Sequence, residues 1–231
     1  MADLLTQAVR NNAEWCSLVC ATHGAAGRFE FAAWVCRDLT PDYYPNLVTL
    51  RADCSAAQTA LAQTLTDYPE TLGIKDSFRT LDLAPHGFRR AIEGHWVRYA
   101  QASSPQTNLD WRPLTTVAEL GRWEVAWGGD VHRGQRRVFL PAILALSSTH
   151  FLAGYFDERL VAGGIVTHAD GVAGLSNIFT APDVPDLVDA VLAEARRVAD
   201  GTPLVGWRAG DTNAEVGESL GPLQVWLRER K

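Results

Sequence analysis

The sequence predicts a protein of the α/β class, because strand-like runs and amphipathic helices follow one another in a regular order. Three strand-like runs occupy residues 151–156, 160–168 and 172–180. The two-residue turns Asp157-Glu158 and Asp170-Gly171 join them, and such turns are typical of antiparallel hairpins. An antiparallel meander is therefore expected.

A helix and two further strands are expected after this meander. Residues 182–199 carry apolar side chains at helical spacing and end before Gly201, which indicates an amphipathic helix with a glycine stop. Residues 203–208 predict a buried strand. A polar turn and a short helix then lead to a last strand at 223–227.

The first half of the chain begins with a helix. Apolar residues recur at helical spacing through residues 2–22, and Gly24 and Gly27 are expected to end that helix. The aromatic-rich run 29–35 predicts a strand or an ordered loop, and residues 46–51 predict a strand.

A second helix and another strand are expected next. Residues 55–65 are rich in Ala and Leu and predict a helix, with Ser55 as its N-cap. Residues 74–83 alternate between apolar and polar side chains, which predicts a strand with Lys75 and Asp76 on its polar side.

The run 102–108 (ASSPQTN) has the composition of a linker, and a short strand is expected before it at 95–100. We therefore expect two domains, residues 1–107 and 108–231. The second domain should open with a helix at 115–127 and a shorter one at 139–146, which has a proline in its first turn.

Composition narrows the classes of partner. The formal net charge is −6, so no strong positive field draws in nucleic acid or an anionic membrane surface. The basic residues Arg133, Arg136 and Arg137 form one loop cluster, which is expected to be solvated. No signal peptide pattern and no apolar run of about 18 residues occur. These observations predict a cytoplasmic protein that binds neither nucleic acid nor membrane.

The cysteines predict reduced thiols and no metal. Cys16, Cys20 and His23 have spacings that a helix could bring together. A structural zinc site needs four ligands, however, and free cysteines are among the most buried residues. We therefore expect Cys16 and Cys20 to be small buried groups and expect no metal site.

Taken in order, the elements over residues 108–231 resemble the GNAT (GCN5-related N-acetyltransferase) superfamily. The segments that carry the resemblance are GYFDERLVAGGIVTHADGVAGLSNIFT (154–180), the helix after it, and LGPLQVWLRE (220–229). Residues 46–99 resemble the partial N-terminal GNAT unit of two-part members. The resemblance implies a mixed α/β sheet with the acyl-CoA N-acyltransferase fold, preceded by an N-terminal partial GNAT-like unit.

The resemblance also implies where a cofactor would bind. In that family, acyl-CoA lies where a strand ends and a helix begins, and an R/Q-x-x-G-x-G/A loop holds its pyrophosphate with backbone amides at a helix N-terminus. This places acetyl-CoA, if it binds, against Asn177, Ile178, Phe179 and Thr180.

The junction itself departs from the family pattern. It is TAPDVPDL (180–187), without Gly or Arg. Pro185 has no N–H to donate, and Asp183 and Asp186 are expected to cap the helix with negative charge. The sequence therefore predicts a degenerate pyrophosphate loop.

No catalytic residue can be assigned. The family commonly uses a carboxylate base and a tyrosine acid, but residues 172–180 contain no Asp or Glu and residues 206–227 contain no Tyr. Ser176 and Asn177 are the strand residues able to hydrogen-bond a substrate. Asp130 and His132 lie in the loop with which the family usually shapes its acceptor pocket.

Two further expectations concern other residues. His168 and Asp170 are expected to serve the hairpin turn rather than acid–base chemistry. Gly163-Gly164 predicts a β-bulge or a close backbone approach.

Two functions follow from the resemblance. The first is acyl transfer from acyl-CoA to a small-molecule or peptide amine. The alternative is a non-catalytic GNAT-like protein that binds a small ligand or a protein partner. A third hypothesis gives the N-terminal aromatics Trp34, Tyr43 and Tyr44 a pocket or a homodimer surface, because exposed aromatics mark interfaces.

Overall fold

The computed structural model describes residues 3–65, 71–99, 108–128, 137–184, 187–210 and 217–229. The chain divides into two compact units. The first unit comprises residues 1–97, 207–213 and 219–231, and the second comprises residues 98–206 and 214–218. The C-terminal strand thus belongs to the first unit, whereas the expected division at residue 107 remains a prediction.

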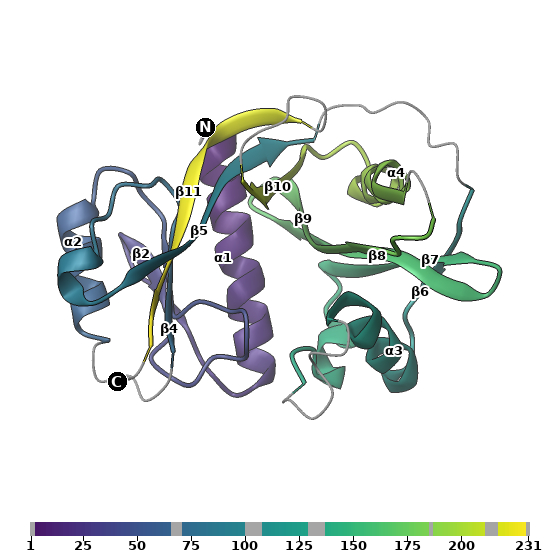
Figure 1. Ribbon diagram of the computed structural model, residues 1–231, viewed down its shortest axis with the longest axis horizontal. Helices are drawn as coiled ribbons and strands as arrows, with labels where there is room; N and C mark the ends of the chain where they lie inside the picture. Colours follow the sequence, from purple (N-terminus) through teal and green to yellow (C-terminus); the bar gives the residue numbers. More distant parts are fainter. Residues whose placement is uncertain are drawn as a thin grey trace. The chain divides into compact units, whose positions relative to one another are not determined.

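The described residues of the first unit form helices and a sheet (Figure 1). Its sheet has the strand order β1-β2-β3-β4-β11-β5. The β3/β4 pair is parallel, whereas the β1/β2, β2/β3 and β4/β11 pairs are antiparallel. The elements are α1 (Leu4–Thr22), β1 (Arg28–Phe29), β2 (Ala33–Val35), β3 (Leu47–Thr49), α2 (Ser55–Gln63), β4 (Leu72–Asp76), the 3-10 turn η1 (Ala84–His86), β5 (Arg89–Arg98) and β11 (Glu218–Arg228).

The second unit has helices on both faces of its sheet. Its strand order is β10-β9-β8-β7-β6, and Figure 1 shows α4 on one face of β7, β8 and β9 and α3 on the other. The β9/β10 pair is parallel and the others are antiparallel, which confirms the predicted mixed α/β sheet. The elements are β6 (Asp110–Pro113), α3 (Val117–Gly128), η3 (Pro141–Ala145), β7 (Thr149–Phe156), β8 (Arg159–Ala169), β9 (Val172–Thr180), α4 (Leu187–Ala199) and β10 (Leu204–Ala209).

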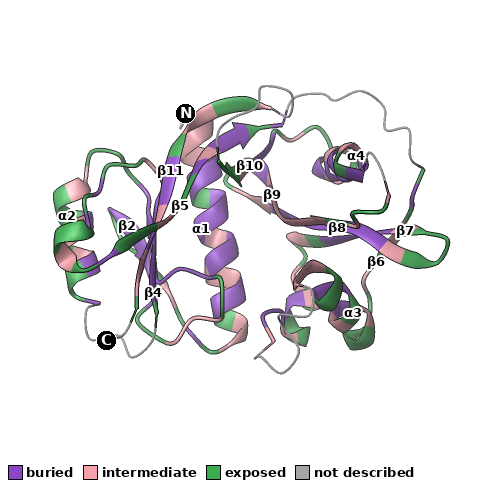
Figure 2. Cartoon of the chain, viewed as in Figure 1, coloured by how far each residue is buried: buried purple, intermediate pink, exposed green. Residues whose placement is uncertain are grey.

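Helix α1 begins and ends where local chemistry dictates. Asp3 caps it, since its Oδ1 accepts the N–H of Thr6 at 2.7 Å. Gly24 follows the helix with φ +77° and donates its N–H to the carbonyl of Ala21, so the predicted glycine stop is confirmed. The buried residues of the helix lie between Ala8 and Cys20, and its two ends are more exposed (Figure 2).

The strand predicted at residues 74–83 is wrong in its length and in its polar face. β4 ends at Asp76, because the Asp76 carboxylate accepts the N–H groups of Phe78 and Leu81 and so turns the chain. Lys75 and Asp76 are both buried, although alternation had predicted a polar side for them. Burial raises the pKa of Asp76.

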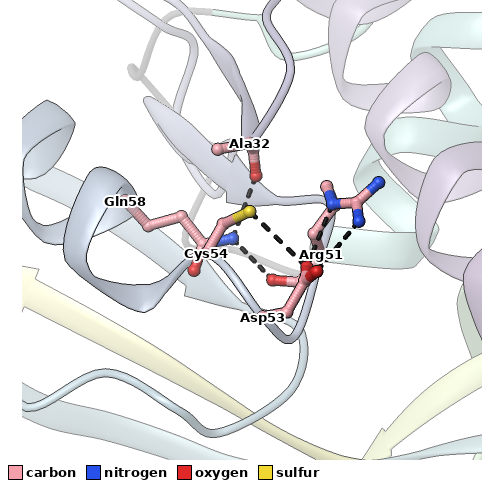
Figure 3. Close-up of polar contacts among 5 residues, drawn as sticks. All are labelled: Ala32, Arg51, Asp53, Cys54 and Gln58. Carbon is pink, nitrogen blue, oxygen red and sulfur yellow. Dashed lines mark hydrogen bonds and ion pairs between the residues drawn. The ribbon is translucent and has the colours of Figure 1, made fainter.

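Helix α2 is attached to the sheet through one buried glutamine. The Gln58 Nε2 donates to the carbonyls of Ala32 at 3.0 Å and Arg51 at 2.7 Å (Figure 3). Ser55 is the first helical residue rather than the N-cap, which is Cys54 and makes no side-chain capping bond. The predicted cap is therefore one residue too late.

Trp123 organises the interior of the second unit. Its ring is fully buried. It makes edge contacts with the rings of Phe139, Phe151 and Phe179, at centroid distances of 5.7, 5.1 and 5.2 Å respectively. Its Nε1 donates to the carbonyl of Leu152 at 2.8 Å. Helix α3 is thereby fixed to β7 and β9.

Several predicted boundaries in this unit shift. The short helix expected at 139–146 is a 3-10 turn over Pro141–Ala145. Helix α4 begins at Leu187 rather than near residue 182. β6 was not predicted, since four residues that include a proline carry little periodic signal. The short helix expected before the last strand falls on residues 211–216, outside the described residues.

Candidate functional site

A β-bulge interrupts β9 directly before its end. Gly163 pairs with Phe179 and Ile165 pairs with Ser176, so Asn177 and Ile178 both lie opposite Gly164. Asn177 adopts a left-handed backbone, with φ +52°, which asparagine tolerates better than most residues. The bulge predicted at Gly163-Gly164 is therefore confirmed, with its extra residue on the partner strand.

β9 extends beyond its pairing with β10. The register of the parallel pair joins Ala173–Leu175 to Leu204–Gly206, whereas β9 continues to Thr180 alongside β8. Within the part of the second unit that is described, the register places no β10 residue opposite the last five residues of β9. The N–H and C=O groups of these five residues that point away from β8 therefore have no partner in the β9/β10 register, and they form a free edge of the sheet there.

Thr180 presents its backbone to this edge. Ala181 donates its N–H to the carbonyl of Val161 at 2.7 Å, and Thr180 pairs with Ala162. Because hydrogen-bonded and non-hydrogen-bonded pairs alternate in an antiparallel ladder, the N–H and C=O of Thr180 are expected to point away from β8. The Thr180 side chain is exposed.

Phe179 belongs to the core through its side chain. Its ring lies 5.2 Å from that of Trp123, and a Cβ on Gly163 would come within 2.5 Å of the Phe179 ring and 2.6 Å of the Leu152 carbonyl oxygen. Only glycine fits there, which confirms the predicted close approach. By the same alternation, the N–H and C=O of Phe179 face β8, so Phe179 offers no backbone group to the outer edge of β9.

Ser176 adds a polar group with unused capacity. Its Oγ is buried and has no hydrogen-bond partner among the described residues. Ser176, Asn177 and Ile178 are half-buried. This end of β9 therefore combines one unsatisfied buried hydroxyl with backbone groups that have no partner in the β9/β10 register.

The junction after β9 has few amides to offer an anion. Ala181 and Val184 donate their N–H groups to Val161 and Ala181, and Pro182 has none. Asp183 does not cap α4, because the helix begins four residues later; its carboxylate instead pairs with Arg159 at 2.8 Å. The Arg159 guanidinium lowers the pKa of Asp183. Pro185 and Asp186 lie outside the described residues.

The predicted acceptor-pocket residues, Asp130 and His132, also lie outside the described residues. Glu124, which was not predicted from the sequence, holds the two flanks of their loop together. This buried carboxylate of α3 accepts hydrogen bonds from Arg137 Nε at 2.8 Å and from the N–H groups of Val138 and Phe139 at 2.5 and 3.2 Å. A glutamate directly after the buried Trp123 was the available signal.

The two histidines near the hairpin lie side by side. The His150 and His168 rings are 5.6 Å apart and perpendicular. Partial burial, and then the charge of His168, lower the pKa of His150. Asp170 and Gly171 both have positive φ, as a two-residue hairpin turn requires, so the predicted hairpin is confirmed.

The N-terminal aromatics do not form a common surface. Trp34 is completely buried and Tyr44 is 8% exposed, whereas Tyr43 is 64% exposed. Trp34 instead fills the space beside Gly27, where a Cβ would come within 2.2 Å of its ring. Trp34 and Tyr44 are thus not exposed aromatics, contrary to the premise of the third hypothesis, and a homodimer stays a prediction.

No group of three or more His, Cys, Asp or Glu side chains among the described residues is placed to hold a metal ion. None of the described helices has the length and apolar character needed to cross a membrane. Cys16 and Cys20 are buried as predicted.

Comparison with known proteins gives a fold. No protein-family model matches the sequence, and no curated protein is similar to it in sequence. A GCN5-related N-acetyltransferase from Kribbella flavida has a similar structure, with a TM-score of 0.58, 13% identity, and coverage of 97% of this chain and 96% of that one. A protein from Novosphingobium aromaticivorans, described as an acetyltransferase of the GNAT family, gives a TM-score of 0.55 at 13% identity over 94% and 96% of the two chains.

A conserved protein of unknown function from Staphylococcus epidermidis is also similar, with a TM-score of 0.53 at 12% identity over 86% and 84% of the two chains. These similarities extend over both units, and the sequence identities are too low to carry an activity across. The chain has the GNAT fold, as the resemblance of its sequence predicted.

Proposed function

We propose that the protein is an acyl-CoA-dependent N-acyltransferase that holds its cofactor mainly through the backbone edge at the end of β9. The observation that carries the proposal is the bulge at Asn177 and Ile178, beyond which β9 continues without a β10 partner in the register. The GNAT fold supports the reaction class by analogy only, since one fold can host several functions.

The cofactor chemistry suits such an edge. The pantetheine arm of acyl-CoA is an extended chain with two amide groups, so it can add to a sheet edge as a peptide strand does. The outward N–H and C=O of Thr180 are one matching pair of groups, and the Asn177 side chain and the unsatisfied Ser176 Oγ are further polar groups nearby in the strand.

The pyrophosphate contributes little in this proposal. Two of the amides of residues 181–184 already serve the protein, and one residue is proline. Asp183 adds a carboxylate, although Arg159 neutralises it. Affinity is therefore expected to be lower than that of a site with a complete phosphate cradle, where each charge-assisted hydrogen bond is worth about 1.5–3 kcal/mol.

In the transfer step, the acceptor amine attacks the thioester carbonyl and the CoA thiolate leaves. The amine must lose a proton, which in the balanced reaction ends on the departing CoA sulfur, and β9 contains no carboxylate to relay it. We propose that the acceptor, a small-molecule or peptide amine, approaches from the loop that contains Asp130 and His132, whose two flanks Glu124 holds together.

Calorimetric titration with acetyl-CoA and with acetyl-pantetheine, which lacks the nucleotide and pyrophosphate, tests the proposal. We expect both to bind with similar affinity. Thr180→Pro removes the outward N–H without removing a bond to β8 and should weaken both about 5- to 10-fold, as the loss of one hydrogen bond does. Thr180→Val keeps the N–H and is the matched control.

If neither acetyl-CoA nor acetyl-pantetheine binds at millimolar concentration, the proposal is refuted. The second candidate function, a non-catalytic GNAT-like protein that binds another small ligand or a protein partner, would then stand. The feature that favours it is the junction at 180–187, which has no glycine or arginine.

A further inference from the structure

Two buried cysteines of the first unit lie in direct contact. Cys20 is in the last turn of α1 and Cys36 directly follows β2, and both side chains are completely buried. Their thiols are hydrogen-bonded to each other. Both are free cysteines, so the two sulfur atoms are neighbours without being bonded.

The backbone holds these two positions together independently of the sulfur atoms. After α1 the chain turns back, and the N–H groups of His23 and Ala25 both donate to the carbonyl of Cys20. The next residue, Ala26, donates its N–H to the Asp38 carboxylate at 3.2 Å. The end of α1 and the segment after β2 are therefore fixed side by side.

The environment distinguishes the two sulfur atoms. The hydrogen bond from Cys20 lowers the pKa of Cys36, and the same bond, together with burial, raises the pKa of Cys20. A thiolate is the reactive form of cysteine. Cys36 is thus suited to react first, and Cys20 is placed to react with the product.

We propose that Cys20 and Cys36 are a redox-active pair that peroxide converts into a reversible disulfide between α1 and the segment after β2. The Cys36 thiolate attacks one peroxide oxygen, the O–O bond breaks, and the hydroxide that leaves is protonated to water. Cys36 is then a sulfenic acid. The Cys20 sulfur attacks the Cys36 sulfur, the S–O bond breaks, and a second water carries away the oxygen and the Cys20 proton.

The other cysteines are unsuited to this reaction. Cys16 lies one turn earlier on α1, and burial raises its pKa, so it stays a thiol. Cys54 is partly exposed at the start of α2, where its thiol donates to Asp53 beside the Arg51 guanidinium (Figure 3). It has no neighbouring thiol among the contacts of the described residues, but it could link two copies of the chain.

Burial sets the rate of the reaction. Peroxide can reach the pair only when the end of α1 opens, and helix ends open more readily than helix centres. We therefore expect oxidation of the pair to be slower than alkylation of Cys54. It should accelerate in low concentrations of urea, which favour such openings.

The experiment uses the full chain with Cys54→Ala, so that no exposed thiol forms intermolecular bonds. After treatment with hydrogen peroxide and alkylation of the remaining thiols, we expect the intact mass to show the loss of two hydrogens. Trypsin cuts after Arg28, so a disulfide appears as a link between peptides 11–28 and 29–37. Dithiothreitol should restore both thiols.

Three further variants identify the partners. In the Cys54→Ala background, Cys16→Ser should leave the cross-linked peptide unchanged. Cys20→Ser should abolish it and leave Cys36 as a sulfenic acid that dimedone traps, and Cys36→Ser should abolish both products. A cross-link that survives Cys20→Ser would overturn the proposal. So would two intact thiols in the folded protein under conditions that oxidise the urea-unfolded chain completely.

Discussion

The interiors of the two units differ in the kinds of side chain that fill them. Most buried polar side chains of the described residues lie in the first unit: Asn11, Asn12, Asn46, Thr49, Gln58, Lys75, Asp76, Ser77 and Gln224. Those of the second unit are Glu124, Thr167 and Glu194. The second interior instead centres on the aromatic contacts of Trp123.

This difference determines what each unit should respond to. An aromatic interior loses stability when volume is removed, because packing is close and cavities are costly. A polar interior loses stability when a hydrogen-bond partner is removed, and it responds to pH because buried charges are desolvated. Substitutions that act on one kind of interior should leave the other largely unchanged.

The largest expected effect is at the aromatic centre. Trp123→Ala should lower the free energy of unfolding by about 3–5 kcal/mol, as loss of a large buried side chain does. Trp123→Phe keeps most ring contacts but loses the Nε1 bond to Leu152, so it should cost about 1–2 kcal/mol through packing and one hydrogen bond. Urea unfolding measures both.

Hydrogen exchange locates the effect. In Trp123→Ala, amide exchange in β7, β8 and β9 should accelerate much more than exchange in α1 and β4. Equal acceleration in both units would contradict the comparison, because it would mean that the two interiors do not respond separately.

A second prediction concerns Glu124, one of the three buried polar side chains described in the second unit. Glu124→Gln removes the charge that Arg137 and two backbone amides share, and it should cost about 2 kcal/mol, as loss of a buried charge-assisted bond does. The control is Arg122→Gln, an exposed change two residues away. A change in Glu124→Gln no larger than that of the control would show that the carboxylate does not hold the loop.

Replacement of Lys75 should raise the free energy of unfolding, whereas the replacements of Trp123 and Glu124 lower it. The Lys75 ammonium is buried, with one hydrogen bond, to Asn12 at 2.8 Å, and the ring of Trp207 at 4.7 Å; the described residues give it no carboxylate. Lys75→Met should therefore stabilise the protein by about 1–2 kcal/mol at neutral pH, because a buried charge is replaced by an apolar chain. Asn12→Ala should destabilise it, since the ammonium loses its acceptor.

The pH dependence separates this effect from a gain in packing. Burial lowers the pKa of Lys75, so the unfolded chain binds its proton more readily and stability rises with pH toward about 10.4, the ordinary lysine value. The advantage of Lys75→Met should thus shrink as pH rises. Burial raises the pKa of Cys16, so above about pH 8.5 the unfolded chain loses that proton more readily and the stability falls as pH rises. The free energy of unfolding of the two proteins is therefore best compared between about pH 7 and pH 8.5. A constant advantage would indicate packing alone.

The same contrast explains what the sequence could predict. The three strands of the meander and the turn at Asp170-Gly171 were predictable, because the second unit follows apolar periodicity and standard turn chemistry. In the first unit, Lys75 and Asp76 broke the pattern, since their burial depends on partners from α1 and from the turn after β4.

The position of the candidate site, at residues 177–180, stays a prediction from the family resemblance, and its geometry could not be predicted. The family resemblance pointed to the end of the strand at 177–180. The extra residue opposite Gly164 and the pairing of Asp183 with Arg159 are tertiary features. No local pattern reports which strand of a pair carries a bulge, or which carboxylate an arginine selects.

The smallest expected effect concerns the pKa of His150 in the second unit. Partial burial and the charge of His168 lower the pKa of His150, so the unfolded chain binds that proton more readily and stability falls as pH drops below about 6.5. His168→Gln removes only the second cause. The pKa of His150, followed by NMR of its ring, should rise but remain below the ordinary value, because partial burial persists. His86→Gln, a change in the first unit, should not move it. If the pKa of His150 is unchanged in His168→Gln, the charge of His168 does not act on His150. Partial burial alone would then account for the lowered pKa of His150.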